Sequence, residues 1–172
     1  MLSIKSALAK PFAKIIFNRI QKWANNPIKT QEKLFQDLIS TAASTTFGKD
    51  HDFISINSYS DFIKRVPVRD YEALKPYVEK VVKGQENVLW PGKPIYFAKT
   101  SGTTSGSKYI PITKESMPYH IEAARNAILL YIHETGNSKF VDGKMIFLQG
   151  SPILDEKNGI QLGRLSGIVA HY

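Results

Sequence analysis

Apolar residues in the first part of the chain recur with the spacing of amphipathic helices. Between Phe12 and Trp23 they return every three or four positions, with cations on the other side of the predicted helix. The run 25–27, Asn-Asn-Pro, predicts the end of that helix, and Thr30 is the expected N-cap of a second one that ends near Gly48. The apolar face of the second helix is Leu34, Phe35, Leu38, Ile39 and Ala42. The pattern therefore predicts a helical hairpin.

Two shorter helices follow in the pattern. The first is expected to begin at Ser60 and to end before Pro67, because proline disfavours the helical conformation in the residue that precedes it. Asp70 is a candidate cap for the next helical turn. We expect Pro76 at the first position of a helix that runs to about Lys83, because the missing N–H of proline removes no helical hydrogen bond at that position.

The apolar pattern changes in the second half of the chain. Residues 95–99 and 109–113 are rich in β-branched and aromatic side chains, which predicts two strands joined by a loop. A long helix then begins at Thr113 or Ser116 and ends at Gly136. Its predicted apolar face is Ile121, Ala124, Ile128 and Ile132.

The remaining pattern predicts one more strand over 144–149 and an exposed turn over 155–159. The chain closes on the apolar run 168–170 without a polar tail, so we expect the whole protein to be longer. Residues 1–86 are thus predicted to be mainly helical and residues 87–172 to mix strand and helix. This order predicts an α/β fold, in which N-terminal helices precede part of an incomplete sheet.

Composition narrows the class of protein. A chain of 172 residues with 42% hydrophobic residues has the make-up of one globular domain, or part of one. The absence of cysteine excludes disulfides, thiolate metal sites and cysteine nucleophiles, and it suits a reducing compartment, so a cytoplasmic location is expected. No run approaches the roughly 20 apolar residues of a membrane span, and the N-terminus lacks the features of a secretory signal.

Positive charge is concentrated at the N-terminus. Of the net charge of +8, residues 1–31 carry six cations and no acid: Lys5, Lys10, Lys14, Arg19, Lys22 and Lys29. The first helix could dock on the rest of the protein through its apolar stripe, or it could lie on an anionic membrane in a non-enzymatic module. A transit peptide is a third interpretation. Net charge alone supports a nucleic-acid partner, and no binding motif accompanies it, so no such partner is expected.

One loop combines small residues, hydroxyls and a cation within nine positions: Thr100, Ser101, Gly102, Thr103, Thr104, Ser105, Gly106, Ser107 and Lys108. Its glycines let the backbone approach an anion closely, and its N–H groups, hydroxyls and ammonium can contact phosphate oxygens. A Walker loop would need glycine at 107 and a serine or threonine after the lysine, with a helix next. Serine, tyrosine and a predicted strand stand there instead, so a Walker-type NTPase is not expected.

The loop resembles the [ST]-S-G-[ST]-T-G-x-P-K loop of adenylate-forming enzymes. Five residues are in register, and the departures lie at Ser105, Gly106 and Ser107. Together with the stretches 47–51, 66–72, 89–92, 97–113 and 163–167, the chain resembles the N-terminal part of the auxin-responsive promoter family of acyl-acid amido synthetases, particularly its bacterial members. The resemblance covers nearly all of this chain and about the first third of a family member.

The resemblance implies both a reaction and a domain. Residues 1–172 would form the N-terminal part of the large domain of an adenylate-forming ligase, with the C-terminal domain absent. Such an enzyme uses ATP, with Mg²⁺ expected in the full-length protein, to adenylate a carboxylic acid. It then transfers the acyl group to an amine or amino acid, releasing AMP after pyrophosphate. The family's adenine, ribose and metal-binding motifs would lie beyond residue 172, so the chain by itself is expected to be inactive.

The resemblance also implies roles for individual residues. Lys108 and Thr103 would be catalytic, because donors aimed at the phosphate oxygens stabilise the charge that develops as pyrophosphate leaves. ATP phosphates would contact Ser101, Gly102, Thr103, Thr104 and Lys108, with Thr100, Ser105 and Gly106 shaping the turn. The helix after the loop would help to line the acyl-acid pocket, where Arg125 is a candidate partner for a carboxylate, the alternative being a solvated arginine. No histidine and carboxylate spacing indicates a metal site in this chain.

Overall fold

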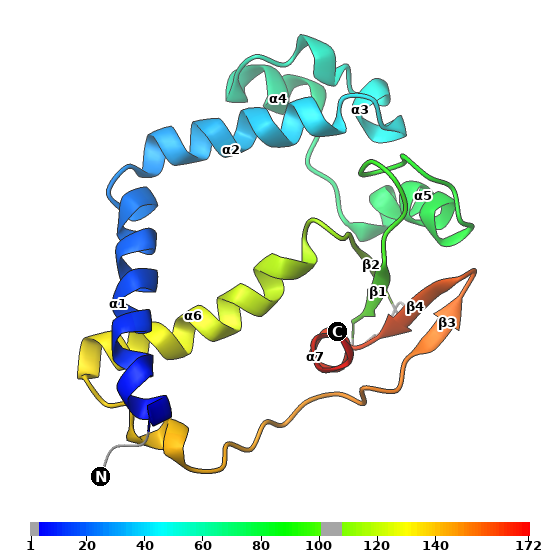
Figure 1. Ribbon diagram of the computed structural model, residues 1–172. Helices are drawn as coiled ribbons and strands as arrows, with labels where there is room; N and C mark the ends of the chain where they lie inside the picture. Colours follow the sequence, from blue (N-terminus) through cyan, green and yellow to red (C-terminus); the bar gives the residue numbers. More distant parts are fainter. Residues whose placement is uncertain (1–3, 101–107) are drawn as a thin grey trace. The chain divides into compact units, whose positions relative to one another are not determined.

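A computed structural model describes residues 4–100 and 108–172 of the protein (Figure 1). The chain divides into two compact units, one formed by residues 1–30 and 117–148 and the other by residues 31–116 and 149–172. Each unit therefore combines two segments that are distant in the sequence.

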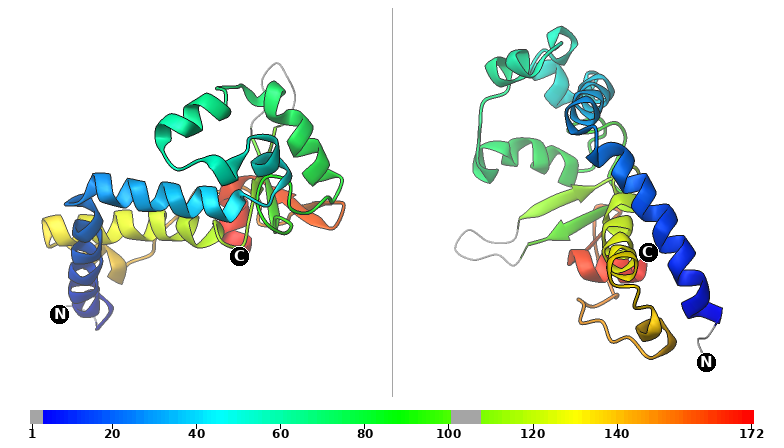
Figure 2. Two further views of the ribbon diagram at one scale, coloured as in Figure 1. Left: turned by 90° about the horizontal axis from the view of Figure 1, so that it is seen from above. Right: turned by 90° about the vertical axis from the view of Figure 1, so that its left-hand side faces the viewer.

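Two long helices form the first unit. Helix α1 (Ile4–Ala24) lies across the C-terminal half of α6 (Met117–Thr135), with the short 3₁₀ helix η2 (Lys139–Asp142) beside them (Figures 1 and 2). Ala13 and Ile16 of α1 pack against Leu129 and Ile132 of α6 and form the core of this unit. A buried hydrogen bond of 2.7 Å joins the hydroxyls of Ser6 and Ser138. Burial of apolar surface between the two helices thus stabilises the unit.

Helix α1 is longer than predicted, and its apolar stripe divides in two. The helix begins at Ile4 and continues through Pro11, which is exposed to solvent. Ile16 and Ile20 contact the core of the unit, as the docking interpretation requires. The other members of the predicted stripe are exposed: Phe12, Ile15 and Trp23.

The long helix α6 agrees with its predicted bounds. It begins after Ser116 and ends before Gly136, whose φ of 66° is the left-handed conformation that commonly ends helices. Its predicted face is wrong in one position, because Ala124 is exposed and Leu129 is buried instead.

Helix α2 (Pro27–Ala42) begins and ends earlier than the sequence predicts. Pro27 is its first residue, a position that proline favours, so Thr30 lies inside the helix instead of capping it. The hydroxyl of Thr30 donates a hydrogen bond of 2.8 Å to the carbonyl oxygen of Asn26, one turn earlier.

Gly48 does not end α2 but lies inside the separate helix α3 (Thr46–Asp50). The hydroxyl of Thr45 caps this helix by accepting a hydrogen bond of 3.0 Å from the backbone N–H of Gly48. A Cβ at residue 48 would collide with the carbonyl oxygen of Ala42. Glycine is required here for the close packing of α3 on the end of α2. The short 3₁₀ helix η1 (Phe53–Ser55) follows.

Capping residues fix the starts of α4 (Tyr59–Arg65) and α5 (Tyr71–Val82). Ser58 and Asp61 form a reciprocal capping box on α4. The carboxylate of Asp70 accepts a hydrogen bond of 2.9 Å from the N–H of Ala73, which confirms it as the cap of α5. The prediction for Pro76 is wrong: it lies inside α5. The helix tolerates it because Pro76 and Glu72, whose carbonyl loses a partner, are both exposed.

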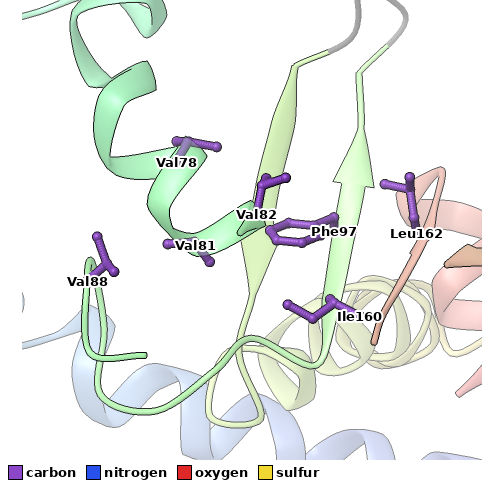
Figure 3. Close-up of a cluster of buried hydrophobic side chains, with 7 residues drawn as sticks. All are labelled: Val78, Val81, Val82, Val88, Phe97, Ile160 and Leu162. Atoms are coloured by element: carbon purple, nitrogen blue, oxygen red, sulfur yellow. The ribbon is translucent and has the colours of Figure 1, made fainter. Parts of the chain in front are cut away.

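The second unit contains a four-stranded sheet in the order β2-β1-β4-β3. Its strands are β1 (Tyr96–Lys99), β2 (Tyr109–Ile112), β3 (Asp155–Lys157) and β4 (Ile160–Gly163), followed by helix α7 (Leu165–His171). Strands β1 and β4 pair in parallel, and the outer pairs are antiparallel. Figure 3 shows the core of this unit, in which the ring of Phe97 lies among valines of α5 and residues of β4. The fold is α/β with part of a sheet, as predicted.

Of two predictions for the last thirty residues, one is wrong and the other is right only in part. Residues 144–149 pair with no strand among the residues that the structure describes, and their side chains are exposed. The expected turn over 155–159 is a hairpin whose two turn residues, Asn158 and Gly159, have φ of 52° and 78°. Two positive φ values match the twist of a tight hairpin, so the flanking residues form strands.

Among the described residues, no helix combines the length and apolarity needed to span a membrane.

Candidate functional site

The predicted phosphate loop is held between two antiparallel strands. Lys99 of β1 pairs with Tyr109 of β2, and the register continues to Tyr96 opposite Ile112. Beyond the last pair, the backbone N–H of Thr100 donates a hydrogen bond of 3.2 Å to the carbonyl oxygen of Lys108. The strand, loop, strand arrangement inferred from the sequence is therefore correct, and the two ends of the loop are fixed against each other.

The structure places two of the predicted loop residues and not the others. Thr100 and Lys108 lie at the ends of the loop. Ser101, Gly102, Thr103, Thr104, Ser105 and Gly106 lie outside the described residues, so their roles stay predictions.

Tyr71, the first residue of α5, supports the end of the loop. Its ring centre lies 5.2 Å from Nζ of Lys108, and its hydroxyl accepts a hydrogen bond of 2.9 Å from the backbone N–H of Tyr109. Asp70 fixes the start of α5 and hence the position of Tyr71. In the part of the chain that the structure describes, no carboxylate pairs with Lys108. The lysine is thus positioned while its charge stays available to an anion.

Two further lysines lie near the base of the loop. Nζ of Lys99 is 3.0 Å from a carboxylate oxygen of Asp155, which compensates its charge. Nζ of Lys157 donates a hydrogen bond of 3.3 Å to the hydroxyl of Tyr109 and lies 4.6 Å from the centre of that ring. Among the described residues, Lys157 therefore has no ion-pair partner, whereas Lys99 has one.

A small cavity lies beside this cluster. Its volume is about 160 Å³, and its lining includes Tyr71, Tyr109 and Lys157 together with Glu72 and Glu79 of α5. Ligand pockets usually enclose about 300 to 1,000 Å³. This cavity is therefore too small to hold a nucleotide by itself.

The Gly163 to Gly167 motif has a structural explanation. The hydroxyl of Ser166 accepts a hydrogen bond of 2.9 Å from the N–H of Gly150. A Cβ at residue 167 would collide with the carbonyl oxygen of Ser151, and one at residue 163 would press on the side chain of Leu154. Gly167 allows α7 to pack directly on the backbone of residues 150–151, and Gly163 leaves room for the side chain of Leu154.

Arg125, the candidate carboxylate partner, lies on α6 in the first unit. One of its terminal nitrogens is 3.3 Å from a carboxylate oxygen of Glu122, and its side chain is 40% exposed. The same guanidinium donates to the side-chain oxygen of Asn126. The charge and the N–H groups of Arg125 thus already have partners on the same helix. Its role in binding a substrate stays a prediction.

Sequence reasoning missed the residues around Lys108. Tyr71 could have been found from Asp70, because a cap at residue 70 makes residue 71 the first of its helix. Lys157 could have been found from Asn158-Gly159, a dipeptide typical of two-residue hairpins, which places Lys157 at the end of a strand.

Comparison with known proteins adds three relatives. Residues 16–172 match the GH3 family N-terminal domain. The chain is 29% identical over 100 residues to indole-3-acetic acid-amido synthetase GH3.2 of Arabidopsis thaliana, covering 57% of this chain and 18% of that protein. It is 35% identical over 103 residues to probable indole-3-acetic acid-amido synthetase GH3.13 of Oryza sativa subsp. japonica (59% and 19% covered). It is 24% identical over 138 residues to jasmonoyl–L-amino acid synthetase JAR4 of Nicotiana attenuata (78% and 23%).

The fold is also that of a solved structure. The match to AtGH3.15 acyl acid amido synthetase in complex with 2,4-DB has a TM-score of 0.79 at 20% identity, and it covers 92% of this chain and 28% of that one. At this identity the likeness concerns the fold, and it confirms the α/β prediction. The chain spans about a fifth of the curated relatives it matches. Because these three relatives are plant proteins, the resemblance to bacterial members stays a prediction.

Proposed function

Because the chain belongs to the GH3 family, we propose that it supplies the phosphate-binding hairpin of an enzyme that adenylates a carboxylic acid and transfers the acyl group to an amine. The observation that carries this proposal is the β1–β2 hairpin. Lys108 lies directly before β2, and its ammonium group contacts the ring of Tyr71. The names of the relatives, which are amido synthetases of indole-3-acetic acid and jasmonate, support the reaction class.

The first step of this reaction places charge where the hairpin can meet it. A carboxylate oxygen of the acid attacks the α-phosphorus of ATP and forms the acyl-adenylate. The bond between that phosphorus and the oxygen bridging to the β-phosphate breaks, and pyrophosphate leaves with the electron pair. Lys108 would stabilise the charge that develops on the pyrophosphate oxygens. Thr103 and the other loop residues would add hydroxyl and backbone N–H donors.

The second step makes the amide. The nitrogen of an amine or amino acid attacks the acyl carbon, the bond from that carbon to the AMP oxygen breaks, and the nitrogen loses a proton. Arg125 would hold a substrate carboxylate after exchanging its ion pair with Glu122. We therefore propose a small carboxylic acid and an amine as the substrates of the enzyme to which this chain contributes.

The described residues fit the phosphates of ATP better than they fit a metal. The ammonium groups of Lys108 and Lys157 lie near one end of the hairpin, over the rings of Tyr71 and Tyr109. Within residues 4–100 and 108–172, no group of three histidine or acidic side chains is arranged to hold a metal ion. When bound in the full-length enzyme, Mg²⁺ would neutralise charge on the leaving pyrophosphate.

The test is acid-dependent exchange of labelled pyrophosphate into ATP by the protein translated from the complete reading frame. We expect Lys108→Ala to lower the exchange rate by about 10² to 10³, the usual effect of losing one such donor. Lys93→Ala is the control, because Lys93 is exposed and pairs with Glu86 away from the loop. Full exchange by Lys108→Ala would show that the lysine is wrongly assigned. Absence of exchange by the wild type across a panel of carboxylic acids would remove the proposal.

The chain of 172 residues should give no exchange by itself, because it spans 28% of the length of AtGH3.15. Exchange by this chain alone would contradict the view that further segments complete the nucleotide site.

A further inference from the structure

One side of α1 presents an apolar stripe that the core of its unit does not use. The stripe consists of Ile4, Leu8, Phe12, Ile15 and Trp23, whose exposed fractions are 79%, 63%, 44%, 59% and 52%. At about 100° per residue, these positions fall within about 100° of the helix circumference. They lie next to the face on which Ala13 and Ile16 contact α6. The helix therefore has one apolar face inside the protein and a second one facing solvent.

Charge distinguishes this stripe from other exposed apolar residues. Lys5, Arg19 and Lys22 are exposed along α1, and residues 1–31 contain six cations and no acid. Helix α2 also exposes two leucines, Leu34 and Leu38, but Glu32 and Asp37 lie beside them. The leucines of α2 therefore lie beside acids, whereas the α1 stripe lies beside cations alone; Ile28 and Lys29 at the start of α2 belong to the same acid-free segment.

Both properties suit the surface of an anionic bilayer. Leucine, phenylalanine and tryptophan enter the boundary between headgroups and acyl chains, and cations along the same helix attract anionic headgroups. Lysine side chains can extend from the edge of such a stripe to keep their ammonium groups at the headgroups. We propose that α1 docks on an anionic lipid surface through this stripe, while its other face stays packed on α6.

This docking goes beyond the proposed ligase reaction. Four of the five stripe residues precede residue 16, where the match to the GH3 family N-terminal domain begins. Most of the stripe therefore lies in a part of α1 that the family match does not include, and Trp23 lies inside the match.

Trp23 provides a direct readout. The chain has two tryptophans, and the other, Trp90, packs against the cluster of Ile39 and Phe53. In Trp90→Phe, the emission comes from Trp23 alone. We expect a blue shift of this emission, and sedimentation with the vesicles, when phosphatidylcholine contains about 30% phosphatidylglycerol. Both effects should weaken as salt is raised. Pure phosphatidylcholine should give much less binding.

Paired variants test the stripe itself. Leu8→Glu with Phe12→Glu introduces two charges into the stripe at exposed positions, and the partition coefficient should fall at least about tenfold. Leu34→Glu with Leu38→Glu is the matched control, because these α2 residues are exposed to a similar extent (54% and 47%). It should change binding less than about twofold. Lys5→Gln and Lys22→Gln should each lower binding to anionic vesicles by up to about fivefold.

Each other outcome overturns the proposal. Equal binding to neutral and anionic vesicles would remove the role of the cations, and equal loss in the α2 control would remove the role of the stripe. A dimer that the α1 double variant abolishes, without lipid binding, would assign the stripe to a second copy of the chain. If the α1 double variant lowers the melting temperature of the protein from the complete reading frame by several degrees, the stripe is covered by that protein's own chain.

Discussion

The ammonium of Lys108 lies 5.2 Å from the ring centre of Tyr71, and the hydroxyl of the same tyrosine accepts a hydrogen bond from the backbone N–H of Tyr109. One side chain of α5 therefore contacts two consecutive residues where the loop enters β2. Tyr71 is also partly buried against the core that Phe97 and the valines of α5 form. It links the hydrophobic core of the unit to the loop lysine.

Removing Tyr71 should weaken nucleotide binding. Tyr71→Leu loses a cation–π contact of about 0.5 to 1 kcal/mol and a hydrogen bond of about 1 kcal/mol, so the KM for ATP in the exchange reaction should rise about threefold to thirtyfold. Tyr71→Phe keeps the ring and should give a smaller rise. Tyr77→Phe, on the same helix, removes a hydroxyl that donates to Asp50 and serves as the control. Equal KM values for Tyr71→Leu and wild type would show that Tyr71 does not position Lys108.

Packing of α7 on residues 150–151 should not tolerate a side chain at residue 167. A Cβ there would collide with the carbonyl oxygen of Ser151. Gly167→Ala should therefore lower the free energy of unfolding by about 1 to 3 kcal/mol, measured by urea denaturation. At Gly143 the nearest atom to an added Cβ is 3.7 Å away and φ is −93°, so Gly143→Ala should be neutral or slightly stabilising. A similar loss in both variants would contradict the steric argument.

Sequence patterns within single segments predicted most of the elements and the ends of the loop. The features that they did not predict depend on contacts between residues distant in the sequence. Hydrophobic spacing located α6, and β-branched residues located β1 and β2. The prediction for Pro76 was wrong because a proline inside a helix is tolerated when the carbonyl that it leaves unpaired reaches water. Whether that carbonyl is exposed depends on the fold and cannot be read from the proline alone. Residues 144–149 have the composition of a strand, yet a strand also needs a partner. The contact of Tyr71 with Lys108 joins residues 37 positions apart, which no periodicity reveals.

The capping box of α4 should make stability depend on pH. The hydroxyl of Ser58, followed by backbone N–H groups, holds the pKa of the Asp61 carboxyl below its ordinary value of 3.8. Because the folded pKa is the lower one, ionised Asp61 favours folding above pH 3.8. This contribution is lost as the pH falls from 3.8 through the depressed value.

Ser58→Ala should raise the pKa of Asp61, measured by NMR titration of its carboxyl carbon, because it removes the largest cause of the shift. Ser60→Ala, on the same helix, is the control and should leave the titration unchanged. A titration of Asp61 unaffected by Ser58→Ala would assign the shift to the backbone N–H groups.

The hairpin that carries Lys157 depends on Asn158 in two separable ways. Its φ of 52° is left-handed, and its side-chain amide donates a hydrogen bond to the carbonyl oxygen of Val82. Asn158→Gly keeps the backbone conformation and loses only that hydrogen bond, at a cost of about 1 kcal/mol. Asn158→Ala loses the same bond but keeps a Cβ in the left-handed region, without the polar side chain that lets asparagine tolerate that conformation, so it should cost about 1 kcal/mol more than Asn158→Gly. Urea denaturation should rank the free energies of unfolding as wild type, then Asn158→Gly, then Asn158→Ala. Equal values for the two variants would show that the turn does not require the left-handed conformation.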